Sequence, residues 1–154
     1  MAACTGFLPW LALGLEPGDA WGKLLRYSVT PEYTRAPIQS VQAVATKTVQ
    51  TRDAGGQLRY LAGNPACGLA LPCAPAVLFS NGKNNFGADL LGAPQANAAA
   101  GNLDEQANDA AALHFISRPA GDDPALAGGE FDDLLTWLPL PLLYQRMRSA
   151  GSLP

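Results

Sequence analysis

Glycine and proline interrupt this chain so often that the sequence favours short elements and long loops over long helices. Together they occupy 29 of the 154 positions, or about 19%, compared with about 12% in an average soluble protein. Hydrophobic residues nevertheless make up 48% of the chain, which is enough for one core at this length. The sequence therefore predicts a folded, loop-rich single domain spanning residues 1–154.

The charge balance argues against two classes of partner. Ten basic and thirteen acidic residues give a formal net charge of −3, so the chain has no cationic field that would neutralise phosphates or anionic lipids. The most apolar run, residues 7–15, contains Pro9 and Gly14 and is much shorter than the roughly 20 residues that span a bilayer. We therefore expect no nucleic-acid partner and no membrane contact by these residues.

Four segments have the composition of β-strands or hairpins: residues 23–30, 38–61, 75–80 and 113–118. The second segment is a hairpin, because Asp-Ala-Gly-Gly at 53–56 accepts the positive φ of a tight turn. The third is continuously apolar, which favours a central strand buried on both faces. The expected fold is α+β, with an antiparallel sheet of about four strands.

The segments between these strands predict loops. Residues 1–18 form an irregular lead-in, because proline and glycine break any long helix there. Residues 81–112 contain few large apolar side chains, so we assign most of them to surface loop, with a short helix near 104–112. Residues 119–130 predict a second surface loop.

The C-terminal part of the chain predicts one regular helix, residues 140–150. Pro141 suits a first helical turn, and Gly151 follows as a stop signal. The preceding segment, residues 131–138, fits the spacing of either a helix or a strand, so both interpretations stay open.

The three cysteines suggest a disulfide. Cys67 and Cys73 enclose a short loop with Gly68 and Pro72, which can bend enough to close a bridge, whereas the partner of Cys4 is left open. The alternative is three reduced, buried thiols in a cytosolic protein. No cysteine or histidine pair has the spacing of zinc ligands.

Acidic residues occur in pairs, and one segment offers several oxygen ligands within a turn and a half. A calcium site is one interpretation of this segment, and a solvated helix face is the other; its residues are Asp104, Glu105, Asn108 and Asp109. Paired carboxylates for glycoside hydrolysis are a further alternative, because the separation that this chemistry needs is spatial. No cofactor other than calcium is expected.

The remaining candidates for chemistry favour structural roles. His114 is the only histidine, and no Gly-x-Ser-x-Gly motif accompanies it, so we expect a structural or surface role. Trp10, Trp21 and Trp137 could stack against a sugar, but tryptophans scattered beside proline and glycine more often anchor loops to a core. We therefore predict that the protein is not an enzyme.

A set of short motifs resembles a known superfamily. Asp19, Trp21, Gly22 and Tyr27 lie in DAWGKLLRY, and VLFSNGKNNFG, DEQAN, FISR, FDDLLTWLPLPLLYQRM and AGSLP follow in that order. In this order the motifs resemble prepilin-type proteins, the type IV pilins and type II secretion pseudopilins, across nearly the whole chain. Ala20 stands where major pseudopilins commonly have proline, so the match to that subgroup is weaker.

The resemblance implies a non-enzymatic structural subunit of a type IV pilus or a type II secretion pseudopilus. It implies that the subunit packs against other pilin or pseudopilin subunits in a filament or its tip. The implied location is periplasmic or extracellular, after anchoring in the bacterial inner membrane. The alternatives from other classes are a secreted ligand-binding module or adhesin, and a hydrolase that uses the paired carboxylates.

In such proteins a long apolar N-terminal helix anchors the subunit and covers one face of the sheet. The sequence has no leader motif and no apolar run of this length, so we expect a pilin-like globular head that lacks this helix. Trp21 and Gly22 would then let the chain turn tightly into the first strand. An apolar sheet face without its cover predicts self-association or a substitute covering element.

Overall fold

A computed structural model describes residues 4–153. Its elements, in chain order, are β1 (Cys4–Phe7), α1 (Trp10–Leu13), β2 (Arg26–Val29), the 3-10 helix η1 (Pro31–Thr34), β3 (Thr48–Arg52), β4 (Leu58–Ala62), β5 (Ala76–Ser80), α2 (Leu103–Ala110), β6 (His114–Ile116), β7 (Leu134–Leu138) and α3 (Leu140–Ser149). Within these residues, no helix is both long and apolar enough to cross a bilayer.

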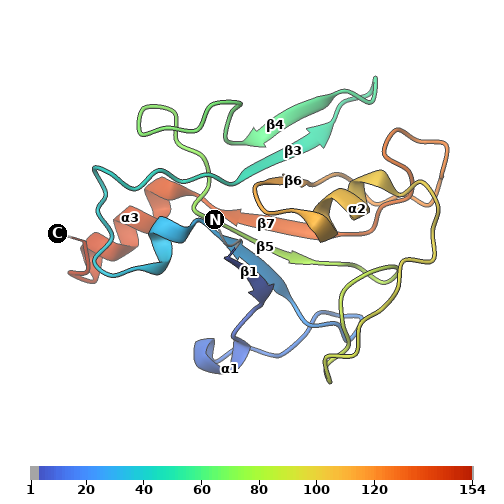
Figure 1. Cartoon of the computed structure of the whole chain (residues 1–154), viewed down its shortest axis with the longest axis horizontal. Coiled ribbons are helices and arrows are strands. Elements are labelled where there is room, and N and C mark those ends of the chain that lie inside the picture. Colours follow the sequence, from blue (N-terminus) through green and yellow to red (C-terminus); the bar gives the residue numbers. More distant parts are fainter. Residues whose placement is uncertain (1–3, 154) are drawn as a thin grey trace.

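The strands form two sheets. The first is antiparallel throughout and has the order β1-β2-β5-β7, and the second has the order β4-β3-β6. In the second sheet β4 is antiparallel to β3, whereas β6 is parallel to it. Figure 1 shows α3 at one end of the long axis and α2 with the loop that follows β6 at the other.

The core lies between the two sheets. Val77 and Phe79 of β5 contact Val49 of β3 and Phe115 of β6, and all four side chains are almost fully buried. The rings of Phe79 and Phe115 are 5.5 Å apart between centroids and tilted, a geometry that aromatic pairs favour. Strand alternation thus gives the first sheet one inward apolar face.

The opposite face of the first sheet is also apolar, and its apolar side chains are only half-buried, so we call it the open face. Tyr27 pairs with Leu78, and Leu78 pairs with Thr136, so these side chains share the face that points away from the core. A groove of 310 Å³ follows this face, and its lining includes Leu8, Tyr27, Ala76, Leu78 and Leu138. The two-sheet arrangement covers only one side of β5.

The α+β class, the four-stranded antiparallel sheet and the C-terminal helix are confirmed. The hairpin also forms, with Gly56 at φ +78° in its turn. The ambiguous segment 131–138 contains strand β7 rather than a helix. Cys67 and Cys73 form the expected disulfide, with their Cα atoms 5.4 Å apart, which rules out the alternative of three reduced thiols.

Two expectations were wrong. Residues 75–80 are not buried on both faces, because Leu78 lies on the open face. Residues 1–18 are not wholly irregular, because they contain β1 and α1. Residues 81–112 are mainly loop with the expected short helix, but part of this loop lies inside the molecule, because Asn81, Asn102 and several neighbouring polar side chains are buried.

Candidate functional site

The motif around Asp19 forms a capped turn that leads into β2. The Asp19 Oδ1 atom accepts hydrogen bonds from the backbone N–H groups of Trp21 and Lys23, each 2.9 Å long. The Oδ2 atom accepts a bond from the Ser80 hydroxyl, so the turn is tied to the end of β5. Gly22 has φ +76°, a conformation that glycine adopts without strain. Strand β1 precedes this turn, so β2 is the second strand rather than the first.

This turn inserts Lys23 into a polar centre. Lys23 is only 4% exposed, and its Nζ atom donates to the backbone carbonyls of Asn84 and Asn85, the latter at 3.0 Å. Burial lowers the pKa of Lys23, while the nearby carboxylates of Asp132 and Asp19 act in the opposite direction. Lys23 therefore serves as an internal cation for the loop that follows β5.

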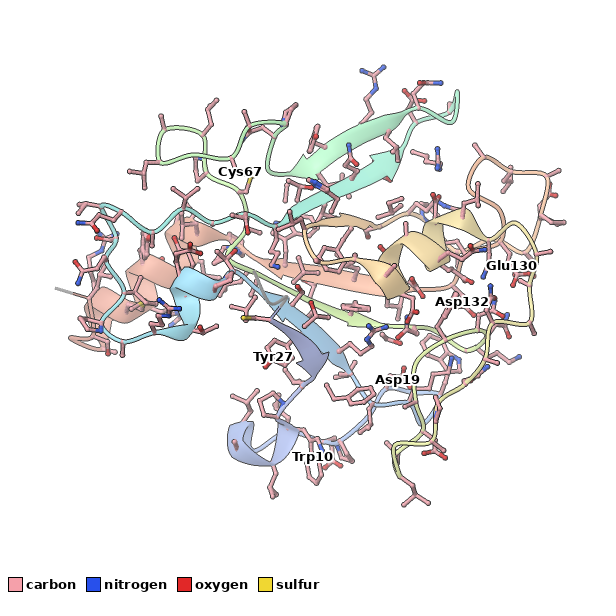
Figure 2. All side chains as sticks on the ribbon, viewed as in Figure 1. Trp10, Asp19, Tyr27, Cys67, Glu130 and Asp132 are labelled. Atoms are coloured by element: carbon pink, nitrogen blue, oxygen red, sulfur yellow. A yellow bond between two sulfur atoms is a disulfide. The ribbon has the colours of Figure 1, made fainter. Side chains whose placement is uncertain are left out.

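Three carboxyl groups converge next to this lysine. One carboxylate oxygen from each of Glu105, Asp132 and Asp133 lies within 4.8 Å of the others. Glu105 comes from α2, and the two aspartates precede β7. Figure 2 labels Asp132 and Glu130 at the end of the molecule opposite α3, where Glu130 accepts a 2.7 Å hydrogen bond from the Asn85 amide.

Two oxygen atoms of this cluster have no hydrogen-bond donor. Asp132 Oδ2 accepts from the Asn84 backbone N–H, and Asp133 Oδ2 accepts from the Asn108 amide. Among the described residues, the Oδ1 atoms of both aspartates are buried without any partner. Because buried acceptors are nearly always satisfied, these two atoms leave room for a further partner, which can be a proton, an ordered water molecule or a cation.

The pKa of Asp133 is consistent with this imbalance. Desolvation by burial is the main cause that raises it, and the negative charges of Glu105 and Asp132 act in the same direction, whereas the hydrogen bond from Asn108 and the charge of Lys23 lower it; the net pKa is about 7. A carboxyl group in this position binds a proton more readily than an exposed one, and a bound cation would remove the same penalty.

The predicted calcium residues do not come together as one ligand set. Asp104 pairs with Arg52 and Arg118, and Asp109 pairs with Arg26. Asn108 joins α2 to β6 through reciprocal bonds with the backbone of Ile116, 2.7 and 2.8 Å long. Of the four residues, only Glu105 belongs to the carboxylate cluster.

Sequence reasoning missed the other parts of this centre. Asp132 and Asp133 are visible as an acidic pair in FDDLLTW, but nothing local shows that they approach α2. The informative signal was the excess of asparagine in residues 81–112, since amide side chains can satisfy a buried polar centre as well as a solvated loop.

The buried cluster fits a hard cation better than it fits hydrolysis. Oxygen ligands that share a Ca²⁺ ion at roughly 2.3–2.6 Å lie at most about 5 Å apart, which agrees with the observed cluster. Glu105 and Asp133 are 1% and 3% exposed, so a glycan cannot reach them. This arrangement can hold a proton or an ion, and two of its three carboxyl groups, those of Glu105 and Asp133, are closed to a glycoside substrate.

The other candidate residues lie apart from this centre. His114 is exposed on β6, and its Nδ1 atom shares a 2.8 Å hydrogen bond with the Thr48 hydroxyl. Trp10 begins α1, Trp21 lies in the capped turn and Trp137 packs against the core from β7. The tryptophans thus come from three separate segments and not from one platform.

No protein-family model matches the chain, and the comparisons with curated proteins and with solved structures returned no significant match. The disulfide indicates an oxidising compartment, such as the periplasm or the cell exterior. Any functional interpretation therefore depends on the geometry of the fold and on the ordered motifs.

Proposed function

We propose that the protein is a non-enzymatic structural subunit of a pilin-like filament, either a type IV pilus or a type II secretion pseudopilus. The observation that carries this proposal is the open apolar face of the first sheet, lined by Tyr27, Ala76, Leu78 and Leu138. A sheet that is apolar on both faces needs a cover on each. In the described residues the second sheet supplies one cover. The proposal assigns the other cover to an N-terminal helix encoded upstream of residue 1 and to neighbouring subunits.

The shape of the face supports a helix as the cover. The groove is long enough to extend from β2 across β5 to β7, and its lining is almost entirely apolar. An apolar helix packs into such a groove by burying side chains on one stripe. The capped turn at Asp19 supports the same proposal, because it aligns β2 so that Tyr27 lies on this face.

The proposed partners are other pilin or pseudopilin subunits, and the proposed location before assembly is the bacterial inner membrane. The coding sequence upstream of residue 1 tests this. The proposal expects a leader and an apolar segment of roughly 20 residues. An upstream sequence that encodes an unrelated folded domain would contradict the assignment.

Substitution on the open face tests the packing role in the producing cell. Leu78→Asp places a charge in the groove, whereas Leu91→Asp makes the same change at a loop position that is 95% exposed. We expect Leu78→Asp to abolish recovery of the protein in sheared filaments and Leu91→Asp to leave it unchanged. Equal recovery of both variants would contradict the proposal.

We also propose that Glu105, Asp132 and Asp133 bind Ca²⁺ as a stabilising ion. Support comes from the two partnerless Oδ1 atoms. At a free Ca²⁺ concentration 100 times the Kd, binding to the native state adds about 2.7 kcal/mol to the free energy of unfolding.

Urea denaturation at pH 8 in CaCl₂, in MgCl₂ and in EDTA measures this effect. Asp133→Asn should lose the calcium response, whereas Asp122→Asn, a change at an exposed acid of the 119–130 loop, should keep it. Identical unfolding curves of the unmodified protein in CaCl₂ and EDTA would exclude the ion.

A further inference from the structure

A second feature, remote from the open face, is a groove beside the β3–β4 turn. Its volume is 460 Å³, and it lies between residues 52–56 and residues 118–127. The two walls approach closely, since a Cβ atom built on Gly56 would lie 2.7 Å from the Cβ atom of Ala127. Figure 1 shows this region at the end of the molecule opposite α3.

The polar side of the groove includes two arginines that share one carboxylate. Arg52 binds Asp104 with two bonds, from Nε at 2.8 Å and from Nη2 at 2.7 Å. Arg118 binds the same carboxylate from Nε at 2.8 Å. Two guanidinium groups therefore face one negative charge, and the group carries a net charge of +1.

The excess charge lies in a partly desolvated place. The side chains of Asp104 and Arg118 are 1% and 7% exposed, and that of Arg52 is 21% exposed. An incompletely compensated charge is costly at such burial. An anion in the groove would reduce this cost.

The arginines also retain donors for such an anion. A guanidinium group has five N–H donors. Besides its bond to Asp104, Arg118 donates from Nη2 to the carbonyl of Gly129, and its Nη1 atom has no acceptor among residues 4–153. Arg52 uses Nη1 for the carbonyl of Gly56. Each arginine can therefore make at least one more charge-assisted hydrogen bond.

The acids near the groove do not supply the missing charge. Asp53 lines the groove, but its carboxylate is engaged by Arg59 and by backbone N–H groups of its own turn. Asp123 accepts from the backbone N–H of Ala125. Among the described residues, neither of these acids bonds to Arg52 or Arg118.

The other walls of the groove are apolar. They consist of the side chains of Pro119, Ala120, Ala125, Leu126 and Ala127, and Leu126 is 50% exposed. We propose that this groove binds a carboxylate attached to a small apolar body, as in an aliphatic amino-acid residue at the end of a peptide. The guanidinium groups hold the carboxylate, and Leu126 and the alanines contact the apolar part.

Titration of the protein with N-acetyl-leucine, followed by NMR chemical shifts, tests this proposal. The matched ligand is N-acetyl-leucinamide, which has the same apolar body and no charge. We expect the acid to shift resonances of residues 52–56 and 118–127 and to bind at least about tenfold more tightly than the amide, because charge-assisted hydrogen bonds are lost with the amide. Equal binding of the two ligands, or no binding of the acid, would overturn the proposal.

Two further experiments distinguish carboxylate binding from the binding of other anions, and loss of the site from loss of folding. Inorganic phosphate that binds while N-acetyl-leucine does not would contradict the carboxylate assignment. Leu126→Glu places a carboxylate in the groove from an exposed loop position and should abolish binding, whereas Leu91→Glu, the same change at an exposed position outside the groove, should retain it. Arg148→Gln, which removes an arginine of α3 that does not line the groove, should also leave binding unchanged; loss of binding in that variant would contradict the proposed location.

Discussion

Asp133→Asn is expected to stabilise the metal-free protein at pH 8. The parent side chain is 3% exposed and has a partnerless Oδ1 atom beside Asp132 and Glu105. An asparagine at this position keeps an acceptor for the Asn108 amide. It also offers an N–H group to the neighbouring carboxylates, and it carries no charge.

The magnitude follows from the pKa of Asp133, which rises from 3.8 to about 7 on folding. Each pKa unit corresponds to about 1.4 kcal/mol, so the cost of ionising the native carboxyl group is on the order of 4 kcal/mol. Because the native pKa is the higher one, the native state holds this proton between about pH 4 and pH 7 while the unfolded state has lost it. The stability that the protonated Asp133 carboxyl group contributes is therefore fully present below about pH 4, and it is lost as the pH rises to about 7.

Urea denaturation in EDTA between pH 5 and pH 8 measures this dependence. The difference in unfolding free energy between Asp133→Asn and the parent should grow in favour of the variant as the pH rises, by a few kcal/mol in total. A variant that is less stable than the parent at pH 8, or a difference independent of pH, would refute the reasoning about the cluster.

Two further changes test the packing of the loops. Gly128→Ala should lower the free energy of unfolding by more than about 2 kcal/mol, because the new Cβ atom would lie 1.9 Å from Asp104 Oδ2. Gly92→Ala is the control, since Gly92 has a similar φ but open space around it, and it should cost only about 1 kcal/mol. Equal costs of the two variants in urea denaturation would contradict this reasoning. Replacing both Cys67 and Cys73 by serine opens a loop of sequence separation 6 and should lower the free energy of unfolding by about 2 kcal/mol. Thermal unfolding measures this loss, and an unchanged melting temperature would show that the disulfide contributes no stability.

Local patterns predicted much of the fold. The Asp-Ala-Gly-Gly turn predicted the β3–β4 hairpin, since positive φ at Gly56 is a local requirement. Pro141 and Gly151 bracket α3 as helix signals should. The antiparallel first sheet follows from short strands that alternate with loops.

Long-range features could not be read from the sequence. The parallel pairing of β3 with β6 joins residues more than sixty positions apart, and no local pattern records it. A continuous apolar strand such as β5 does not reveal that only one of its faces is covered. In residues 81–112, the same polar composition that suits a solvated loop also builds a buried network around Asn85 and Glu105.

The candidate site was predicted only in part for the same reason. Helical spacing grouped Asp104, Glu105, Asn108 and Asp109, but the fold turns these side chains toward different partners. Glu105 meets Asp132 and Asp133 because β7 begins beside α2, which is a tertiary relation.

The central claim is that the open face of the first sheet is a packing surface. Sedimentation velocity of the domain over a range of concentrations tests it most directly, with Leu78→Asp and Leu91→Asp as the matched pair. The account predicts that the parent and Leu91→Asp self-associate and that Leu78→Asp sediments as a folded monomer. A parent domain that remains monomeric and stable at all concentrations would contradict the claim.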